Sequence, residues 1–348
     1  ITATISTTAI GDLDDLTGTG NAYTITVNTA QVTAAALRTV NEATTVAVNA
    51  TNVTQITGSA ADLAVVYDGG ISNLGDETII LTDTTLAAAT LTPTVNGYSS
   101  VAINANSVTT LTGTNAEIVA AYAADTAGTV IIDGDAKLTV SDNITSAEAN
   151  TLDAKTTGVI TATISTTAIA DLDDLTGTGN AYTITVGDAS VTAAALKTVN
   201  DATTVNVTAT AVTAIAGSAA DLASVYGGGI TGLGDETVTV SNAQVTAADL
   251  NTINSGTSVN VVATNVTQIT GSRTELATTY GGGISNLGDE AIIVSDSVTS
   301  AQANTIDAYT TGAVTATIST QTIADLDDLT GTGNAYTITV GDASVTAA

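Results

Sequence analysis

The segment ITATISTTAIADLDDLTGTGNAYTITV, residues 160–186, occurs three times in this chain with few changes. Residues 1–27 read ITATISTTAIGDLDDLTGTGNAYTITV, and residues 314–340 read VTATISTQTIADLDDLTGTGNAYTITV. The copies therefore begin at residues 1, 160 and 314, at intervals of 159 and 154 residues. Long internal repeats of this kind are typical of proteins whose core grows in one dimension rather than filling a sphere.

A shorter repeat lies inside each long period. Units such as residues 183–204 alternate with longer units such as residues 205–237. Each unit opens with alternating β-branched residues, for example Ile184 and Val186, which predicts a strand. A turn follows, and then a short helix that begins after a Thr or Ser N-cap and places residues such as Leu196 and Val199 on one face. In the longer units the helix is stronger, as in residues 218–226, and ends at a run of glycines.

These units predict a repeat solenoid. A strand, a turn and a short helix cannot bury an apolar face alone, so neighbouring units must stack on one another. We expect a parallel β-solenoid with short helices on the return side, similar in logic to a leucine-rich repeat, and an elongated rod. Residues 1–348 are expected to form one continuous segment. Because neither end reads as a polar capping repeat, we expect it to continue in a longer chain or in a continuous fibre.

The composition agrees with a stack of similar layers. Hydrophobic residues make up 44% of the 348 residues, and nearly all are Ala, Val, Ile and Leu; there are 9 Tyr and no Phe, Trp, Met or Cys. The net charge is −29, from 34 acidic and 5 basic residues. Such a charge predicts no binding to nucleic acid, which needs clustered Lys and Arg. With no apolar run near 18 residues, the sequence also predicts no membrane insertion.

Catalysis has few candidate residues in this sequence. The chain contains no His and no Cys, which removes the commonest general bases and nucleophiles. The acidic residues recur at every period, as residues of a solvated surface would. The prediction is that the chain is not an enzyme.

Three glycine-rich loops each end in an Asp–Glu pair. Ca²⁺ prefers six to eight oxygen ligands from flexible loops, so these pairs are the candidate metal ligands, and Ca²⁺ is the one candidate cofactor. The alternative is a turn whose glycines permit positive φ and whose acids are simply exposed. The candidate ligands are Asp76, Glu77, Asp235, Glu236, Asp289 and Glu290.

Other polar motifs also allow two interpretations. The DLDD cluster, residues 171–174 in the middle copy, is either the solvated face of a short helix or a Ca²⁺ ligand group; we favour the solvated face. GTGN, residues 177–180, is expected to be a turn rather than a phosphate cradle, because neither a helix nor a Lys follows it. Outward Thr residues are either ordinary strand residues or a flat face that binds glycan or ice.

The repeat LDDLTGTGNAYTITV, followed by VTAAALKTVNDATTV and VTAIAGSAADLASVY, resembles the repeats of giant cell-surface proteins of cyanobacteria. The large motility-associated surface protein of marine Synechococcus is similar to it. The resemblance covers essentially the whole chain. It implies an exported protein that is displayed on, or shed from, the cell surface.

Two functional classes follow from these observations. The first is an extracellular structural or adhesive fibre, or a cell-surface filament, that self-associates or continues in a very long chain. The second is a surface adhesin module that binds glycan or ice through an outward Thr and Asn face, with surface polysaccharide as its partner. Both predict an extracellular or cell-surface location.

Overall fold

The computed structural model describes residues 1–344. Residues 345–348, which the sequence predicts to continue a third copy of the unit that begins at Thr183, lie outside the described residues. The chain divides into two compact units. The first contains residues 1–165 and 179–182, and the second contains residues 166–178 and 183–348.

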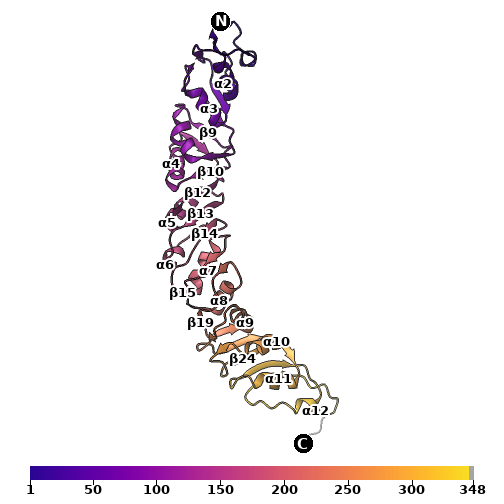
Figure 1. Ribbon diagram of the computed structural model, residues 1–348. Helices are drawn as coiled ribbons and strands as arrows, with labels where there is room; N and C mark the ends of the chain where they lie inside the picture. Colours follow the sequence, from indigo (N-terminus) through magenta and orange to yellow (C-terminus); the bar gives the residue numbers. More distant parts are fainter. Residues whose placement is uncertain (345–348) are drawn as a thin grey trace. The chain divides into compact units, whose positions relative to one another are not determined.

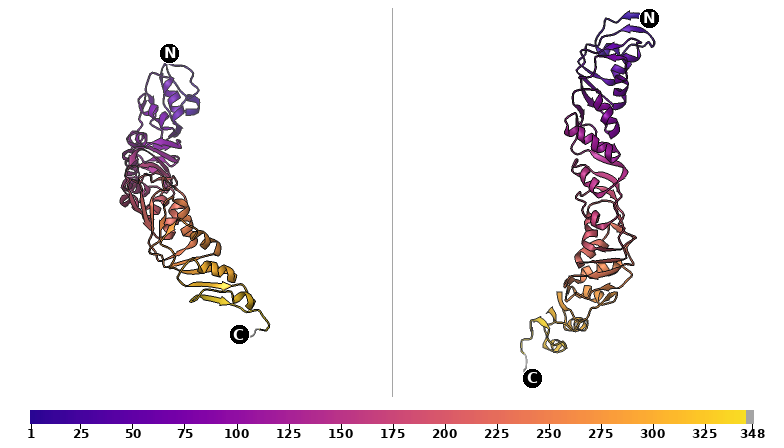
Figure 2. Two further views of the ribbon diagram at one scale, coloured as in Figure 1. Left: turned by 60° about the horizontal axis from the view of Figure 1, so that its bottom comes forward. Right: turned by 90° about the vertical axis from the view of Figure 1, so that its left-hand side faces the viewer.

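In both units short parallel strands are interleaved with short helices, and neighbouring helices lie side by side (Figure 1, Figure 2). The fold is therefore a repeating α/β arrangement of parallel sheets, as the sequence predicts. The strands of these sheets pair in parallel, because a helix or a long loop separates each strand from its partner.

The first unit contains two five-stranded sheets and two small strand pairs. One sheet has the order β11-β9-β7-β5-β3, made of β11 (Val130–Ile132), β9 (Ile103–Ala105), β7 (Thr78–Leu81), β5 (Gln55–Gly58) and β3 (Gln31–Thr33). The other has the order β14-β13-β12-β10-β8, made of β14 (Ala181–Thr183), β13 (Ile160–Ile164), β12 (Lys137–Ile144), β10 (Thr110–Gly113) and β8 (Thr85–Ala87). The pairs are β1 (Thr2–Thr4) with β2 (Ala22–Thr24), and β4 (Val48–Asn49) with β6 (Ile71–Ser72).

The second unit repeats this plan. One sheet has the order β15-β17-β19-β21-β23, made of β15 (Ser190–Thr192), β17 (Ala214–Gly217), β19 (Thr237–Val240), β21 (Val261–Val262) and β23 (Ile284–Ser285). The other has the order β20-β22-β24-β25-β26, made of β20 (Gln244–Thr246), β22 (Gln268–Gly271), β24 (Ala291–Val298), β25 (Val314–Ile318) and β26 (Ala335–Ile338). A short pair joins β16 (Val207–Thr208) to β18 (Ile230–Thr231).

The helices are short in both units. The first unit contains α1 (Ile10–Leu13), α2 (Ala34–Glu42), α3 (Ala60–Tyr67), the irregular turns η1 (Thr90–Thr94) and η2 (Val95–Gly97), α4 (Asn115–Thr126) and α5 (Ser146–Asp153). The second contains α6 (Ile169–Leu172), α7 (Ala193–Asp201), α8 (Ala219–Tyr226), α9 (Ala247–Gly256), α10 (Arg273–Thr279), α11 (Ser300–Asp307) and α12 (Ile323–Leu326).

The core is a rank of aliphatic side chains held in register. In the first unit Val32 pairs with Ile56, and Ile56 pairs with Ile79; all three are buried. Because side chains alternate between the two faces of a strand, every second residue joins this rank. The predicted helix face is also confirmed, since Leu196 and Val199 of α7 are both fully buried.

The helices α2 to α5 and α7 to α11 are each capped by their own N-cap side chain, whereas α1, α6 and α12 are not, and some helix starts are also bound by a residue of a later repeat. The Thr192 side chain accepts the amide of Ala195 at 3.2 Å, which confirms the predicted Thr cap. In addition, the first amide of α3, on Ala60, donates to Asp83 Oδ2 at 2.8 Å, and the first amide of α10, on Arg273, donates to Asp296 Oδ1 at 2.8 Å. A carboxylate at a helix N-terminus also opposes the helix dipole favourably. Helix starts therefore tie one repeat to the next.

We expect Asp83→Ala to lower the free energy of unfolding of the chain by about 1 kcal/mol, because the first amide of α3 loses its acceptor. Urea denaturation followed by circular dichroism measures the loss. Asp15→Ala, at an exposed acid, is the matched control. Equal effects of the two substitutions would show that the contact between repeats contributes nothing.

Candidate functional site

The six predicted Ca²⁺ ligands lie in three equivalent loops, between β6 and β7, β18 and β19, and β23 and β24. The structure separates the two acids of each pair. The three glutamates are completely buried, whereas the three aspartates are exposed. The carboxylates of one pair therefore do not face the same space. The buried members are Glu77, Glu236 and Glu290, and the exposed members are Asp76, Asp235 and Asp289.

Each buried glutamate is held by a tyrosine and by the backbone of its own loop. Tyr67 donates from Oη to Glu77 Oε2 at 2.9 Å, and the Gly75 amide donates to the same oxygen at 2.8 Å. Tyr280 donates to Glu290 Oε2 at 2.8 Å, and the Gly288 amide donates to Oε1 at 2.8 Å and to Oε2 at 3.0 Å. Tyr226 and Gly234 complete the third copy with Glu236. These donors make the buried carboxylate tolerable without a cation.

A fourth loop lacks the glutamate although its repeat has the tyrosine. Residues 133–136 read DGDA, so Ala136 stands where the other loops carry Glu. The tyrosine lies ten residues before the glutamate in the three complete loops. The same tyrosine lies eight residues after the helix N-cap, and in the fourth repeat the residue eight after Thr114 is Tyr122. The fourth repeat therefore keeps a buried tyrosine, Tyr122, but lacks the glutamate.

A pair of Ser or Thr residues in the following repeat, here called the Ser/Thr fastener, donates hydrogen bonds to the carbonyl groups of each loop. Ser99 Oγ donates to the carbonyl of Glu77 at 2.6 Å, and the Ser100 amide donates to the carbonyl of Gly75 at 2.8 Å. Thr310 and Thr311 bind the loop of Glu290 identically, at 2.6 and 2.7 Å. These residues were not predicted from the sequence. Their signal is a Ser/Thr pair before a post-helix strand, as in SSVAI, TTVAV, TSVNV and TTGAV.

Each loop also contains two residues with positive φ. Asn73, Gly232 and Asn286 occupy the same place and have φ values of 60°, 85° and 61°. Asn and Gly are the residues that adopt this conformation most readily. The expectation of positive φ at the glycines is confirmed at Gly75, Gly234 and Gly288, whose φ values are 132°, 146° and 130°.

The tyrosine phenols stay protonated in this environment. Burial and the neighbouring carboxylate of Glu77 raise the pKa of Tyr67 far above its ordinary value. Burial and the hydrogen-bonded glutamates raise the pKa of Tyr226 and of Tyr280 in the same direction. A neutral phenol is the form that can donate, so each pair keeps its hydrogen bond at neutral pH.

Ca²⁺ binding stays a prediction, and the geometry restricts which residues could bind the ion. Among residues 1–344 no three acids, His or Cys come close enough to hold a metal ion. The glutamate oxygens already accept hydrogen bonds from within the fold. A bound Ca²⁺ would depend on Asp76, Asp235, Asp289 and exposed loop carbonyls.

The other motifs take up structural positions. In the DLDD cluster Leu172 is buried while Asp171 and Asp174 are exposed, which agrees with the solvated helix face. In GTGN the Asn180 side chain is buried; its Oδ1 accepts the Ile160 amide at 2.9 Å, and its Nδ2 donates to Asp153 at 2.9 Å. Asn180 therefore ties two repeats of the first unit together rather than holding a phosphate.

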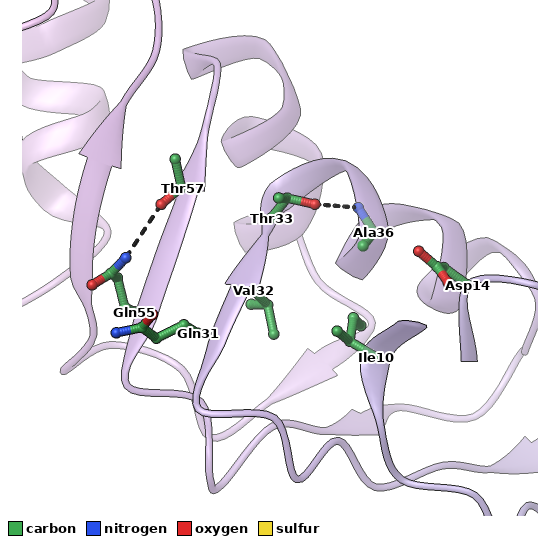
Figure 3. Close-up of a pocket in the computed structure, with 8 residues that line it drawn as sticks. All are labelled: Ile10, Asp14, Gln31, Val32, Thr33, Ala36, Gln55 and Thr57. Atoms are coloured by element: carbon green, nitrogen blue, oxygen red, sulfur yellow. Dashed lines mark hydrogen bonds between the residues drawn. The ribbon is translucent and has the colours of Figure 1, made fainter. Parts of the chain in front are cut away.

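A groove of about 500 Å³ lies on the outward face of the first unit (Figure 3). Amide and hydroxyl side chains from β3 and β5 line it, with Asp14 at the end of α1. The full lining is Ile10, Asp14, Gln31, Val32, Thr33, Ala36, Gln55 and Thr57. Within it, Gln55 Nε2 donates to Thr57 Oγ1 at 3.4 Å.

The second unit repeats this groove at about 270 Å³. Its strand residues Gln244–Thr246 read QVT, as Gln31–Thr33 do, and Thr270 corresponds to Thr57. The outward face is not a continuous rank of Thr, however. Thr33 and Thr57 are followed in register by Ile80 and Asn104.

Comparisons with known proteins returned nothing: no family model, curated protein or solved structure matches this chain. None of the helices in the described part of the chain has the length and apolar character to cross a membrane.

We expect Tyr280→Phe to destabilise the chain by about 1–3 kcal/mol, because the buried Glu290 carboxylate loses a donor. Tyr309→Phe removes a hydroxyl from a half-buried ring and is the control, with an effect below about 0.5 kcal/mol. Urea denaturation compares the two. If the two variants unfold at the same urea concentration, the pair is not a stabilising unit.

Stability should also fall at alkaline pH. Below pH about 10 the phenols are protonated in both folded and unfolded chains, so their contribution is fully present. Above it the unfolded chain releases phenolic protons that the folded chain retains, and unfolding is favoured. Tyrosinate absorbance and circular dichroism should then change together. In a variant that carries Tyr67→Phe, Tyr226→Phe and Tyr280→Phe, this shared change should be smaller. If all phenols ionise near pH 10 in the folded chain, the tyrosines are not held by the buried glutamates as described.

Proposed function

We propose that this chain is a length of an extracellular structural or adhesive fibre, or cell-surface filament, built as a parallel β-solenoid in the form of a rod. The observation that carries the proposal is the recurrence of the same bonds between successive repeats. Strand ladders, Asp caps and Ser/Thr fasteners each link one repeat to the next within both units. A chain organised this way extends by addition of repeats and needs no closed core.

Charge and composition support the same function. With a net charge of −29, rods would repel one another at low salt and remain dispersed, while screening or divalent ions would let them approach. The resemblance to giant cyanobacterial cell-surface proteins supports export and surface display. We propose no catalytic role, since the acids described above serve as caps, hydrogen-bond acceptors or solvated groups.

A tandem series tests the rod. Residues 160–313 contain the six helices α6 to α11, and the sequence after Val314 repeats the sequence after Ile160. Two, three and four head-to-tail copies of this segment should therefore lengthen by about 30 Å per copy, at about 4.8 Å per repeat. Small-angle scattering should show one cross-section throughout. Irregular increments, or scattering typical of beads on a flexible string, would refute the continuous rod.

A Ca²⁺ titration tests bridging by the exposed aspartates. We expect Ca²⁺ to raise Tm and to increase light scattering by the chain, and a chelator to reverse both effects. Asp76→Asn, Asp235→Asn, Asp289→Asn should abolish the response, whereas the same number of Asn substitutions at Asp15, Asp174 and Asp328 should not. Unchanged melting and scattering would remove Ca²⁺ from the proposal.

Glycan binding is the second candidate function, and the paired grooves favour it. Carboxamides, hydroxyls and one carboxylate are groups that hydrogen-bond sugar hydroxyls. Ice binding is not supported in the same way, because Ile80 and Asn104 interrupt the outward row of Thr residues. A neutral polysaccharide should bind the chain in calorimetry, and Gln31→Ala, Gln55→Ala should weaken binding while leaving the groove of the second unit occupied. Equal binding by this variant and the unchanged chain would exclude the first groove.

A further inference from the structure

Two pairs of tyrosine rings lie stacked between successive repeats. The rings of Tyr67 and Tyr98 have centroids 4.6 Å apart and planes 2° from parallel. The rings of Tyr280 and Tyr309 have centroids 5.0 Å apart and planes 12° from parallel. In each pair one ring ends or follows a long-unit helix, and the other lies just before the Ser/Thr fastener of the next repeat. Four of the nine tyrosines in the chain are placed in this way.

Tyrosine is the only readily oxidised residue type that this sequence contains. There is no Cys, Met, Trp or His anywhere in the 348 residues. The chain therefore cannot form disulfides, and a one-electron oxidant has no competing side chain to attack. We propose that Tyr67–Tyr98 and Tyr280–Tyr309 are sites of covalent dityrosine cross-linking, with hydrogen peroxide and a peroxidase as the oxidant.

The buried glutamates prepare one ring of each pair for oxidation. Tyr67 Oη donates to Glu77 at 2.9 Å, and Tyr280 Oη donates to Glu290 at 2.8 Å. Loss of an electron turns a phenol into a strong acid, and a carboxylate already at hydrogen-bond distance can take the proton as the electron leaves. Each oxidised tyrosine becomes a neutral phenoxyl radical beside a protonated glutamate.

The second ring of each pair supplies the partner radical. Tyr98 and Tyr309 are half-buried, so solvent reaches them. A cavity of about 300 Å³ lined by Ala64, Val65, Tyr67, Asp68 and Tyr98 opens beside the first pair. Two phenoxyl radicals then join through ring carbons next to the hydroxyl-bearing carbon. The hydrogens on those carbons move to the oxygens, which restores two phenols and an aromatic cross-link.

The reaction balances without a further reagent. Two tyrosines lose two hydrogen atoms in total, and one hydrogen peroxide accepts them and gives two waters. The proton held by the glutamate is among those consumed. Each cross-link would join two successive repeats covalently, and its role in strengthening a fibre rests on the proposed function.

Tyr226 is an internal control that separates oxidation from coupling. It donates to Glu236 as the other two tyrosines do to their glutamates. The place of its stacking partner is taken by Gly256, where a Cβ would overlap the Tyr226 ring. Gly256 precedes Thr257, which donates to the Glu236 carbonyl, just as Tyr98 precedes Ser99 and Tyr309 precedes Thr310. Tyr226 should be oxidised without forming an intramolecular cross-link.

The experiment oxidises the full chain at low protein concentration with peroxidase and limiting hydrogen peroxide. We expect dityrosine fluorescence in the monomer, a mass loss of two hydrogens per cross-link, and proteolytic fragments that join Tyr67 to Tyr98 and Tyr280 to Tyr309. The monomer yield should not change on dilution. Tyr98→Phe should abolish the first cross-link and spare the second, and Tyr309→Phe should do the reverse, since Phe keeps the ring without the phenol.

Three results would overturn the proposal: no cross-link within monomers, cross-links that involve Tyr226 as often as the stacked pairs, or loss of both cross-links in either single variant. Circular dichroism of each variant before oxidation shows whether it is folded. Small-angle scattering of the tandem copies tests the rod independently of oxidation. A rod without cross-links and cross-links without a rod are therefore distinguishable results.

Discussion

Parallel stacking of repeats in register is the constraint on which the rest of this structure depends. A single repeat has only a few aliphatic side chains and a short helix, too little to offset the entropy of ordering its own backbone. Val32, Ile56 and Ile79 become buried only because three strands align them. The same alignment brings helix starts, glycine-rich loops and tyrosine rings of successive repeats side by side.

Stacking buries backbone amides and carbonyls as well as apolar side chains. Contacts between repeats supply the hydrogen bonds that these backbone groups need. Asp83 and Asp296 accept the first amides of helices in the preceding repeat. Ser99 and Thr310 bind the carbonyls of preceding loops. Because an unsatisfied buried amide or carbonyl costs as much as a lost hydrogen bond, these contacts specify register as well as adding stability.

The buried glutamates are the least expected consequence of the stacking of repeats. A carboxylate without a cation is normally expensive to bury. Here a neutral tyrosine hydroxyl and backbone amides supply its hydrogen bonds, and the glycine-rich loop wraps it. The same tyrosines, in a chain that has no sulfur, provide a route to covalent links between repeats. A strongly acidic surface is compatible with these oxidisable tyrosine pairs, because the glutamates that bind Tyr67 and Tyr280 are buried.

The sequence by itself determined the repeats, the strand–turn–helix order within each, the aliphatic core rank and the Thr N-caps, because these depend on neighbours a few residues apart. It also predicted the solvated face of Asp171 and Asp174. Only the tertiary structure decided which acid of each Asp–Glu pair is buried, which later Asp caps an earlier helix, and which tyrosines stack. Those contacts join residues about 20–30 positions apart, and their partners are set by the register of stacked repeats. Local spacing carries no information about that register until the repeats are placed against one another.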